Sequence, residues 1–84
     1  MALLMTPAQI ERARELLDGV LVDRDEISLL DATRNLEIAD RHERALADKV
    51  RPALVSLLLR RVGFRKVGDI GTGYDRCPLY RKAA

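Results

Sequence analysis

Positively charged side chains gather in the second part of this chain, where they could bind an anion. Residues 49–84 hold nine lysines and arginines against two aspartates, a net charge of +7. Residues 1–48 hold six arginines against eleven acidic residues, a net charge of −5. This distribution suggests a basic surface facing an anionic partner, with ordinary solvation of an unevenly charged surface as the alternative. The nine basic residues are Lys49, Arg51, Arg60, Arg61, Arg65, Lys66, Arg76, Arg81 and Lys82.

The sequence shows no set of residues spaced for catalysis or for holding a metal ion. The single cysteine, Cys77, and the single histidine, His42, cannot supply the four ligands of a Cys/His zinc site. The acidic residues Asp23, Asp25 and Glu26 are typical of a solvated helix start, where a carboxylate caps backbone amides. Without a nucleophile next to a general base, the chain is predicted not to be an enzyme. A lone cysteine gives no disulfide framework, which suggests a cytoplasmic location.

The chain is predicted to form one domain over residues 1–84. Its 48% hydrophobic and 33% charged residues are typical of a folded globular protein. Only 4% of the residues are aromatic, so the core is expected to consist mainly of Leu, Val, Ile and Ala. The longest apolar run, Pro52–Leu59, is far shorter than the roughly 20 residues of a transmembrane helix, so no membrane contact is predicted. A homodimer contact through the first helix or Met1–Met5 would add buried surface to this small core.

The first part of the chain is predicted to form a helical support over about residues 6–50. Thr6 supplies the hydroxyl of an N-cap, and Pro7 suits the first helical position because it has no backbone N–H. Gln9 completes a capping box with Thr6. Apolar residues then repeat at helical spacing, which predicts a helix that ends near Val22.

Two further helical segments are expected before the basic region. Apolar spacing predicts a short helix over about residues 25–34, with a break at Asn35. A third helical segment is expected from residue 36 to about Lys49. The spacing is also compatible with one continuous, bent helix over residues 25–50, and the sequence leaves both alternatives open.

A helix and a hairpin are predicted over about residues 52–82. Pro52 disfavours a helical residue before it and suits the start of a new helix, so a tight joint between two helices is expected there. The new helix, up to Val62, is apolar on nearly every side, which predicts a place in the centre of the core. Gly63 is placed for a left-handed C-terminal cap, with Phe64 as its hydrophobic contact.

The hydrophobic period changes after Gly63. Residues 64–70 and 76–82 form two short runs that contain β-forming residues. Gly71, Gly73 and their neighbours are typical of a turn. The sequence therefore predicts a basic β-hairpin at the C-terminal end.

The order of helix, joint, helix, glycine-phenylalanine stop and basic hairpin resembles the winged helix-turn-helix. More loosely, it is similar to the small winged modules of phage and plasmid replication and regulatory proteins. The resemblance covers about residues 40–82. It implies an α+β fold, namely a small winged-helix-like domain with three to four helices followed by a C-terminal β-hairpin.

The resemblance also implies non-catalytic binding of nucleic acid, in particular double-stranded DNA. The chain would then be a small regulator or replication accessory of a phage or mobile element. The implied contact residues on the helix and its entry are Lys49, Arg51, Ser56, Arg60 and Arg61. Those on the hairpin, or wing, are Arg65, Lys66, Tyr74, Arg76, Arg81 and Lys82. Arg60 and Arg61 could equally complement the helix dipole, and because the helix is so apolar, the wing is expected to carry more of the binding.

The sequence Asp69–Gly73 looks like the glycine-rich first motif of S-adenosylmethionine-dependent methyltransferases. That motif implies a buried parallel strand before it, a helix after it and a full doubly wound sheet around it. The residues that follow leave no room for such a sheet. The glycines are therefore interpreted as turn residues, and no cofactor is predicted.

The competing interpretation is a protein-interaction module that binds and inhibits or adapts a larger host or phage protein. In that case the acidic helical part or the basic hairpin would dock on an oppositely charged surface. The apolar helix would then serve the core alone. Binding to a random DNA duplex distinguishes the two, because phosphate-driven affinity falls steeply with ionic strength.

Overall fold

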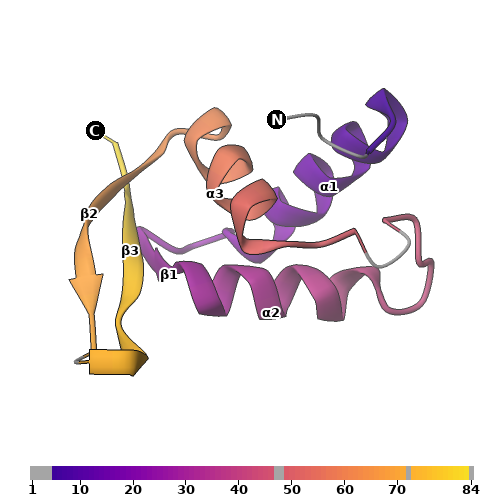
Figure 1. Ribbon diagram of the computed structural model, residues 1–84. Helices are drawn as coiled ribbons and strands as arrows, with labels where there is room; N and C mark the ends of the chain where they lie inside the picture. The colour runs from indigo at the N-terminus through magenta and orange to yellow at the C-terminus, as the bar shows by residue number, and fades with distance from the viewer. Residues whose placement is uncertain (1–4, 47–48, 72, 84) are drawn as a thin grey trace.

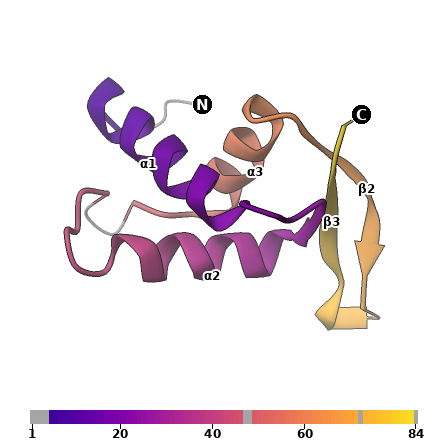
Figure 2. The same ribbon diagram turned by 180° about the vertical axis from the view of Figure 1, so that it is seen from behind.

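The computed structural model describes residues 5–46, 49–71 and 73–83, which form three helices and a three-stranded antiparallel sheet (Figure 1). In chain order the elements are α1 (Pro7–Val20), β1 (Glu26–Ser28), α2 (Leu29–Asp40), α3 (Pro52–Arg61), β2 (Phe64–Ile70), a short 3-10 helix η1 (Gly73–Asp75) and β3 (Cys77–Lys82). β3 is the central strand, between β1 and β2. The helices lie to one side of the sheet (Figures 1 and 2). The predicted α+β class and C-terminal hairpin are confirmed.

α1 begins as predicted, with a complete capping box. Thr6 Oγ1 accepts a hydrogen bond from the Gln9 amide at 3.2 Å, and Gln9 Oε1 accepts one from the Thr6 amide at 3.0 Å. Pro7 occupies the first helical turn, where its missing N–H leaves no donor unpaired. The helix ends at Val20, slightly earlier than expected, and buries Leu17 completely.

The predicted helix over residues 25–34 is wrong at its start, where the chain forms strand β1. Ile27 lies directly opposite Tyr80 of β3, and both side chains are buried. Ser28 ends the strand and caps α2, because its Oγ accepts a hydrogen bond from the Asp31 amide at 3.1 Å. Three residues are too few to show a strand period, so pairing with a strand near the other end of the chain decides their conformation.

α2 continues through Asn35 and ends at Asp40, so the predicted break at Asn35 is wrong. The helical segment predicted over residues 36–49 is also wrong beyond Asp40, because the described residues that follow form turns and irregular backbone. The same observation rules out one bent helix over residues 25–50. Residues 47–48, which belonged to both predictions, lie outside the described part of the chain.

The loop between α2 and α3 is held by side chains, in place of the predicted tight joint. The Asp40 carboxylate accepts the Leu46 amide at 3.1 and 3.3 Å, and the Leu46 side chain is buried. Arg12 of α1 donates to Glu43 at 2.6 Å and to Glu15 at 3.0 Å. The hydrogen bonds that Arg12 donates to Glu15 and Glu43 raise the pKa of Arg12 above its ordinary value. These contacts fasten the loop to α1.

α3 begins at Pro52 and lies in the centre of the core, as predicted. Four of its side chains are buried, namely Leu54, Val55, Leu58 and Leu59. Gly63 follows with a φ of 96°, a left-handed conformation that glycine adopts without steric cost. Phe64 is buried just beyond it. Among the described residues, the largest fully buried side chains are Tyr80, Leu17, Leu36, Leu46, Leu58, Leu59 and Val55. The core is therefore mainly aliphatic, as expected, and Tyr80 and Phe64 add aromatic rings to it.

The hairpin has the predicted strands and an additional irregularity. β2 spans the predicted residues, and β3 begins one residue later than expected. The register shifts between Lys66 and Gly68, so Val67 is the extra residue of a β-bulge. Pro78 is tolerated in the central strand because the pairing with β1 reaches only as far as Leu79.

We expect Gly63→Ala to destabilise the domain by about 1–2 kcal/mol, because alanine is unfavourable at this positive φ. A Cβ at Gly63 would meet no atom within 4 Å, so the cost is conformational. Gly19→Ala in α1 is the matched control. It also lies in open space and should stabilise the helix by up to about 1 kcal/mol. Urea denaturation measures both changes, and effects of the same sign would contradict the assigned helix cap.

Candidate nucleic-acid interface

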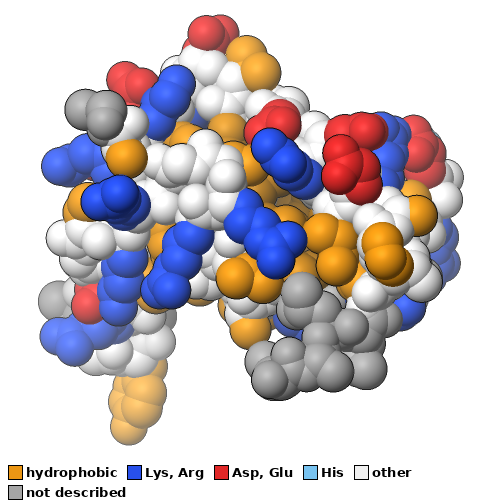
Figure 3. Space-filling model, turned by 90° about the horizontal axis from the view of Figure 1, so that it is seen from above, with side chains coloured by type: hydrophobic (Ala, Val, Ile, Leu, Met, Phe, Trp, Pro, Cys, Tyr) orange, Lys and Arg blue, Asp and Glu red, His pale blue; other side chains and the backbone are white. Residues whose placement is uncertain are grey.

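The basic residues near the C-terminus lie on the surface. From Arg60 onward every lysine and arginine is exposed, on the last turn of α3 and along the hairpin. These residues are Arg60, Arg61, Arg65, Lys66, Arg76, Arg81 and Lys82. In Figure 3, Lys and Arg side chains gather on the left, over the hairpin side, while Asp and Glu side chains are more frequent toward the right. The charge asymmetry of the sequence is therefore also an asymmetry in space.

The sheet divides neighbouring basic residues between its two faces. Successive side chains of a strand point to opposite sides, and residues directly opposite on paired strands share a side. Lys66 lies opposite the buried Tyr80 and so belongs to the inner face, which packs on the helices. Arg65 lies opposite Arg81 and belongs to the outer face. Arg65 and Lys66 are adjacent on the predicted wing, but the strand places their side chains on opposite faces.

The inner face of the sheet meets α3 at a hydrogen bond between Ser56 Oγ and the Tyr80 hydroxyl. Arg60 follows Ser56 by about one helical turn, on the same side of α3. Lys66 is the neighbour of Tyr80 across the hairpin. The bond therefore holds two surfaces next to each other, the side of α3 that contains Arg60 and the inner face of the sheet that contains Lys66. We call this region the corner between α3 and the hairpin. Ser56, a predicted contact residue, makes its hydrogen bond inside the domain.

On the outer face, Arg81 is held by a carboxylate. Its Nη2 and Nε atoms donate to Glu26 Oε2 at 2.7 and 2.9 Å, and Glu26 lies directly opposite Arg81 on β1. Glu26 was predicted to belong to a helix start, so this partner of Arg81 was not expected. The available signal was the opposite charge of two residues far apart in the chain, which becomes informative once β1 is known to pair with β3.

The end of the hairpin carries apolar side chains among the basic ones. Tyr74 in η1 is fully exposed, and Val67 and Ile70 of β2 are each exposed by nearly half. An exposed tyrosine ring beside basic residues can stack on a base or a sugar. Tyr74 is therefore accessible, and its stacking on a nucleotide stays a prediction.

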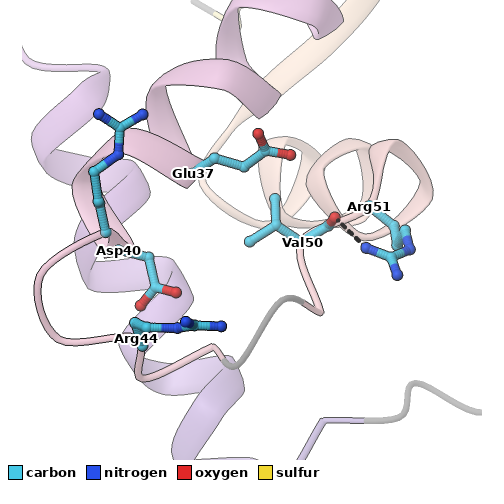
Figure 4. A pocket seen from close by; sticks show the side chains of 6 residues that line it. Glu37, Asp40, Arg44, Val50 and Arg51 are labelled. Carbon is cyan, nitrogen blue, oxygen red and sulfur yellow. Dashed lines mark hydrogen bonds between the residues drawn. The ribbon is translucent and has the colours of Figure 1, made fainter.

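Lys49 and Arg51 lie at the other end of α3 from the hairpin. A helix of 10 residues is about 15 Å long. Lys49 Nζ donates to Gln9 Oε1 at 3.1 Å, which ties Lys49 to the start of α1. Arg51 is the N-cap residue of α3, and its Nη1 donates to the Val50 carbonyl at 3.0 Å (Figure 4). The structure thus does not bring these two predicted contact residues together with those of the hairpin.

A hollow of about 430 Å³ lies beside the start of α3 (Figure 4). Its lining residues are Glu37, Asp40, Arg41, Arg44, Val50 and Arg51. Two carboxylates and three guanidinium groups give it charges of both signs. Because Asp40 is buried with its carboxylate bonded to the backbone, and Glu37 adds a second negative charge, the hollow is poorly suited to bind a phosphate.

Within the described residues, no three His, Cys, Asp or Glu side chains are grouped to hold a metal ion. None of the described helices is long and apolar enough to cross a membrane. Cys77 Sγ is half-buried and accepts a hydrogen bond from the Leu30 amide at 3.2 Å.

Comparison with known proteins finds no matching family, no similar curated protein and no similar solved structure.

The contact between Ser56 and Tyr80 can be tested by a double-mutant cycle. Tyr80→Phe should cost about 1 kcal/mol, because it removes one hydrogen bond. Ser56→Ala should cost about 1–3 kcal/mol, because it leaves a buried phenol hydroxyl without its partner. The double variant should cost less than the sum, since the bond is lost only once. Urea unfolding measures all three, and strict additivity would show that the two hydroxyls do not interact.

Proposed function

We propose that this chain is a winged-helix-like domain that binds double-stranded DNA through the last turn of α3 and the β2–β3 hairpin. The observation that carries the proposal is the exposed basic surface from Arg60 to Lys82. Part of the order on which the resemblance rests also supports it, since α3, Gly63 with Phe64, and the basic hairpin follow one another, while a loop takes the place of the expected tight joint before α3. In this proposal the domain serves as a small regulator or replication accessory of a phage or mobile element.

Contact with phosphates is the chemistry for which this surface is best suited. The buried side of α3 consists of aliphatic residues, which leaves Arg60 and Arg61 as its charged surface groups. An arginine can bind a phosphate or form a bidentate pair with a guanine edge. Five of the seven exposed cations from Arg60 onward lie on the hairpin, where they can release counterions from the DNA backbone. Affinity is therefore expected to depend on salt more than on sequence.

A protein-interaction module is the second candidate, and exposed apolar side chains on α2 favour it. Leu30 and Ile38 are each exposed by about half and recur on one broad side of the helix. A protein partner there would bury both side chains without using the hairpin. Binding of this kind would depend weakly on ionic strength, whereas phosphate binding depends on it strongly.

Fluorescence anisotropy with a labelled random duplex tests the proposal. If six or more phosphates are contacted, the affinity of the natural sequence should fall about a thousandfold between about 50 and 200 mM salt. The double variant Arg60→Ala, Lys66→Ala removes two exposed cations from the corner between α3 and the hairpin. We expect it to weaken binding at every salt concentration and to reduce the slope of log affinity against log salt by about 2.

The double variant Arg14→Ala, Arg34→Ala is the matched control, because both arginines are exposed on the helices of the acidic part. It removes the same charge and should leave the slope unchanged. Equal losses in the two double variants would indicate a response to net charge alone. Absence of binding at about 50 mM salt would overturn the proposal.

A further inference from the structure

We propose that Arg65 and Arg81 form a phosphate-binding subsite on the outer face of the sheet, and that Glu26 competes with the phosphate for Arg81. For a phosphate of DNA, this inference rests on the function proposed above. The subsite itself requires only a phosphate group, whatever molecule carries it. It lies on the opposite side of the sheet from the corner formed by α3 and the hairpin.

Strand register places the three charged side chains in one row across the sheet. Glu26 of β1 is directly opposite Arg81 of β3, and Arg81 is directly opposite Arg65 of β2. Each of the three adjoins a buried residue of its own strand, and these residues are Ile27, Tyr80 and Phe64. Because neighbouring side chains in a strand point to opposite sides, the charged row faces outward.

The single negative charge in this row does not balance its two positive charges. Two arginines directly opposite each other on paired strands repel, and one carboxylate cannot neutralise both. Arg81 donates through two nitrogens to the single oxygen Glu26 Oε2. Within the described residues, Arg65 has neither a hydrogen bond nor an ion pair. A phosphate monoanion between the two guanidinium groups would neutralise the row.

The two guanidinium groups also have the donors that a phosphate needs. Arginine presents a planar fork of N–H groups that matches phosphate oxygens, and such charge-assisted bonds are stronger than neutral ones. Glu26 occupies one such fork, that of Arg81. The side chains of Glu26 and Arg81 are 44% and 58% exposed, so water screens their attraction and a phosphate can displace the carboxylate.

A purely structural account explains only part of this arrangement. A cross-strand pair of Glu26 and Arg81 would help to hold β1 on β3. It gives no reason for a second arginine on the far side of Arg81, where the like charge is unfavourable. A phosphate subsite accounts for both arginines and assigns Glu26 the role of limiting its affinity.

The experiment uses the full chain, with inorganic pyrophosphate and a random DNA duplex as separate probes. Glu26→Gln should tighten binding of both probes by about two- to fivefold, because it removes the competing charge and keeps a similar shape. Arg65→Ala should weaken both by about threefold or more. Since Arg65 has no partner to lose in the described structure, this variant tests the subsite even if Glu26→Gln folds poorly.

Asp69→Asn is the matched control for a change in net charge. Asp69 pairs with Lys66 at 3.8 Å and lies opposite Pro78, so it belongs to the inner face of the same hairpin. The inference requires a larger gain in pyrophosphate affinity for Glu26→Gln than for Asp69→Asn. It also requires that the Glu26→Gln gain disappear when Arg65 is alanine.

Equal gains in the two charge-removing variants, or a gain that survives Arg65→Ala, would overturn the subsite. If the duplex binds with a steep salt dependence but these comparisons fail, the proposed function stands and the subsite does not. If pyrophosphate behaves as expected but no duplex binds at about 50 mM salt, the subsite stands and the proposed function fails. The two proposals are therefore separable in one set of measurements.

Discussion

Packing of Tyr80 between α3 and the neighbouring strands joins the sheet to the helices. Tyr80 is 2% exposed, lies opposite Ile27 of β1 and Lys66 of β2, and meets Ser56 of α3 through its hydroxyl. A buried tyrosine contributes a large apolar ring and needs a partner for its hydroxyl, and both needs are met here. One side chain of the central strand thereby connects all three strands to α3.

This contact also decides how the basic surface is arranged. Once Tyr80 faces the helices, strand geometry turns Arg81 outward, and the same holds for Arg65 beside the buried Phe64. Lys66 is then left on the helix side, with Arg60 on the adjoining side of α3. The hairpin therefore presents cations on both faces, and the two faces differ in their counter-charges. On the outer face Glu26 pairs with Arg81, and on the inner face Asp69 lies 3.8 Å from Lys66.

The residue types of the candidate site and their exposure could be predicted from the sequence. The arrangement of these residues on the two faces of the sheet could not. Exposure of the basic residues follows from their type, because a charged side chain is rarely buried without a partner. Tyr74 was also expected at the surface, since it lies in a turn. The local sequence carries no information about which cations share a face with Lys66, or about the separation of Lys49 from the hairpin along α3. Glu26 was missed because its partner Arg81 lies near the opposite end of the chain.

Several elements have local signals and could be predicted from short stretches of the sequence. The capping box at Thr6 and Gln9, the helix start at Pro52 and the left-handed cap at Gly63 each depend on residues a few positions apart, and all three are present. The strand at residues 26–28 and the end of α2 at Asp40 have no such local signal and became evident from the fold. The reason is physical, because burial of Ile27 against Tyr80 and of Leu46 in the core depends on contacts between distant segments.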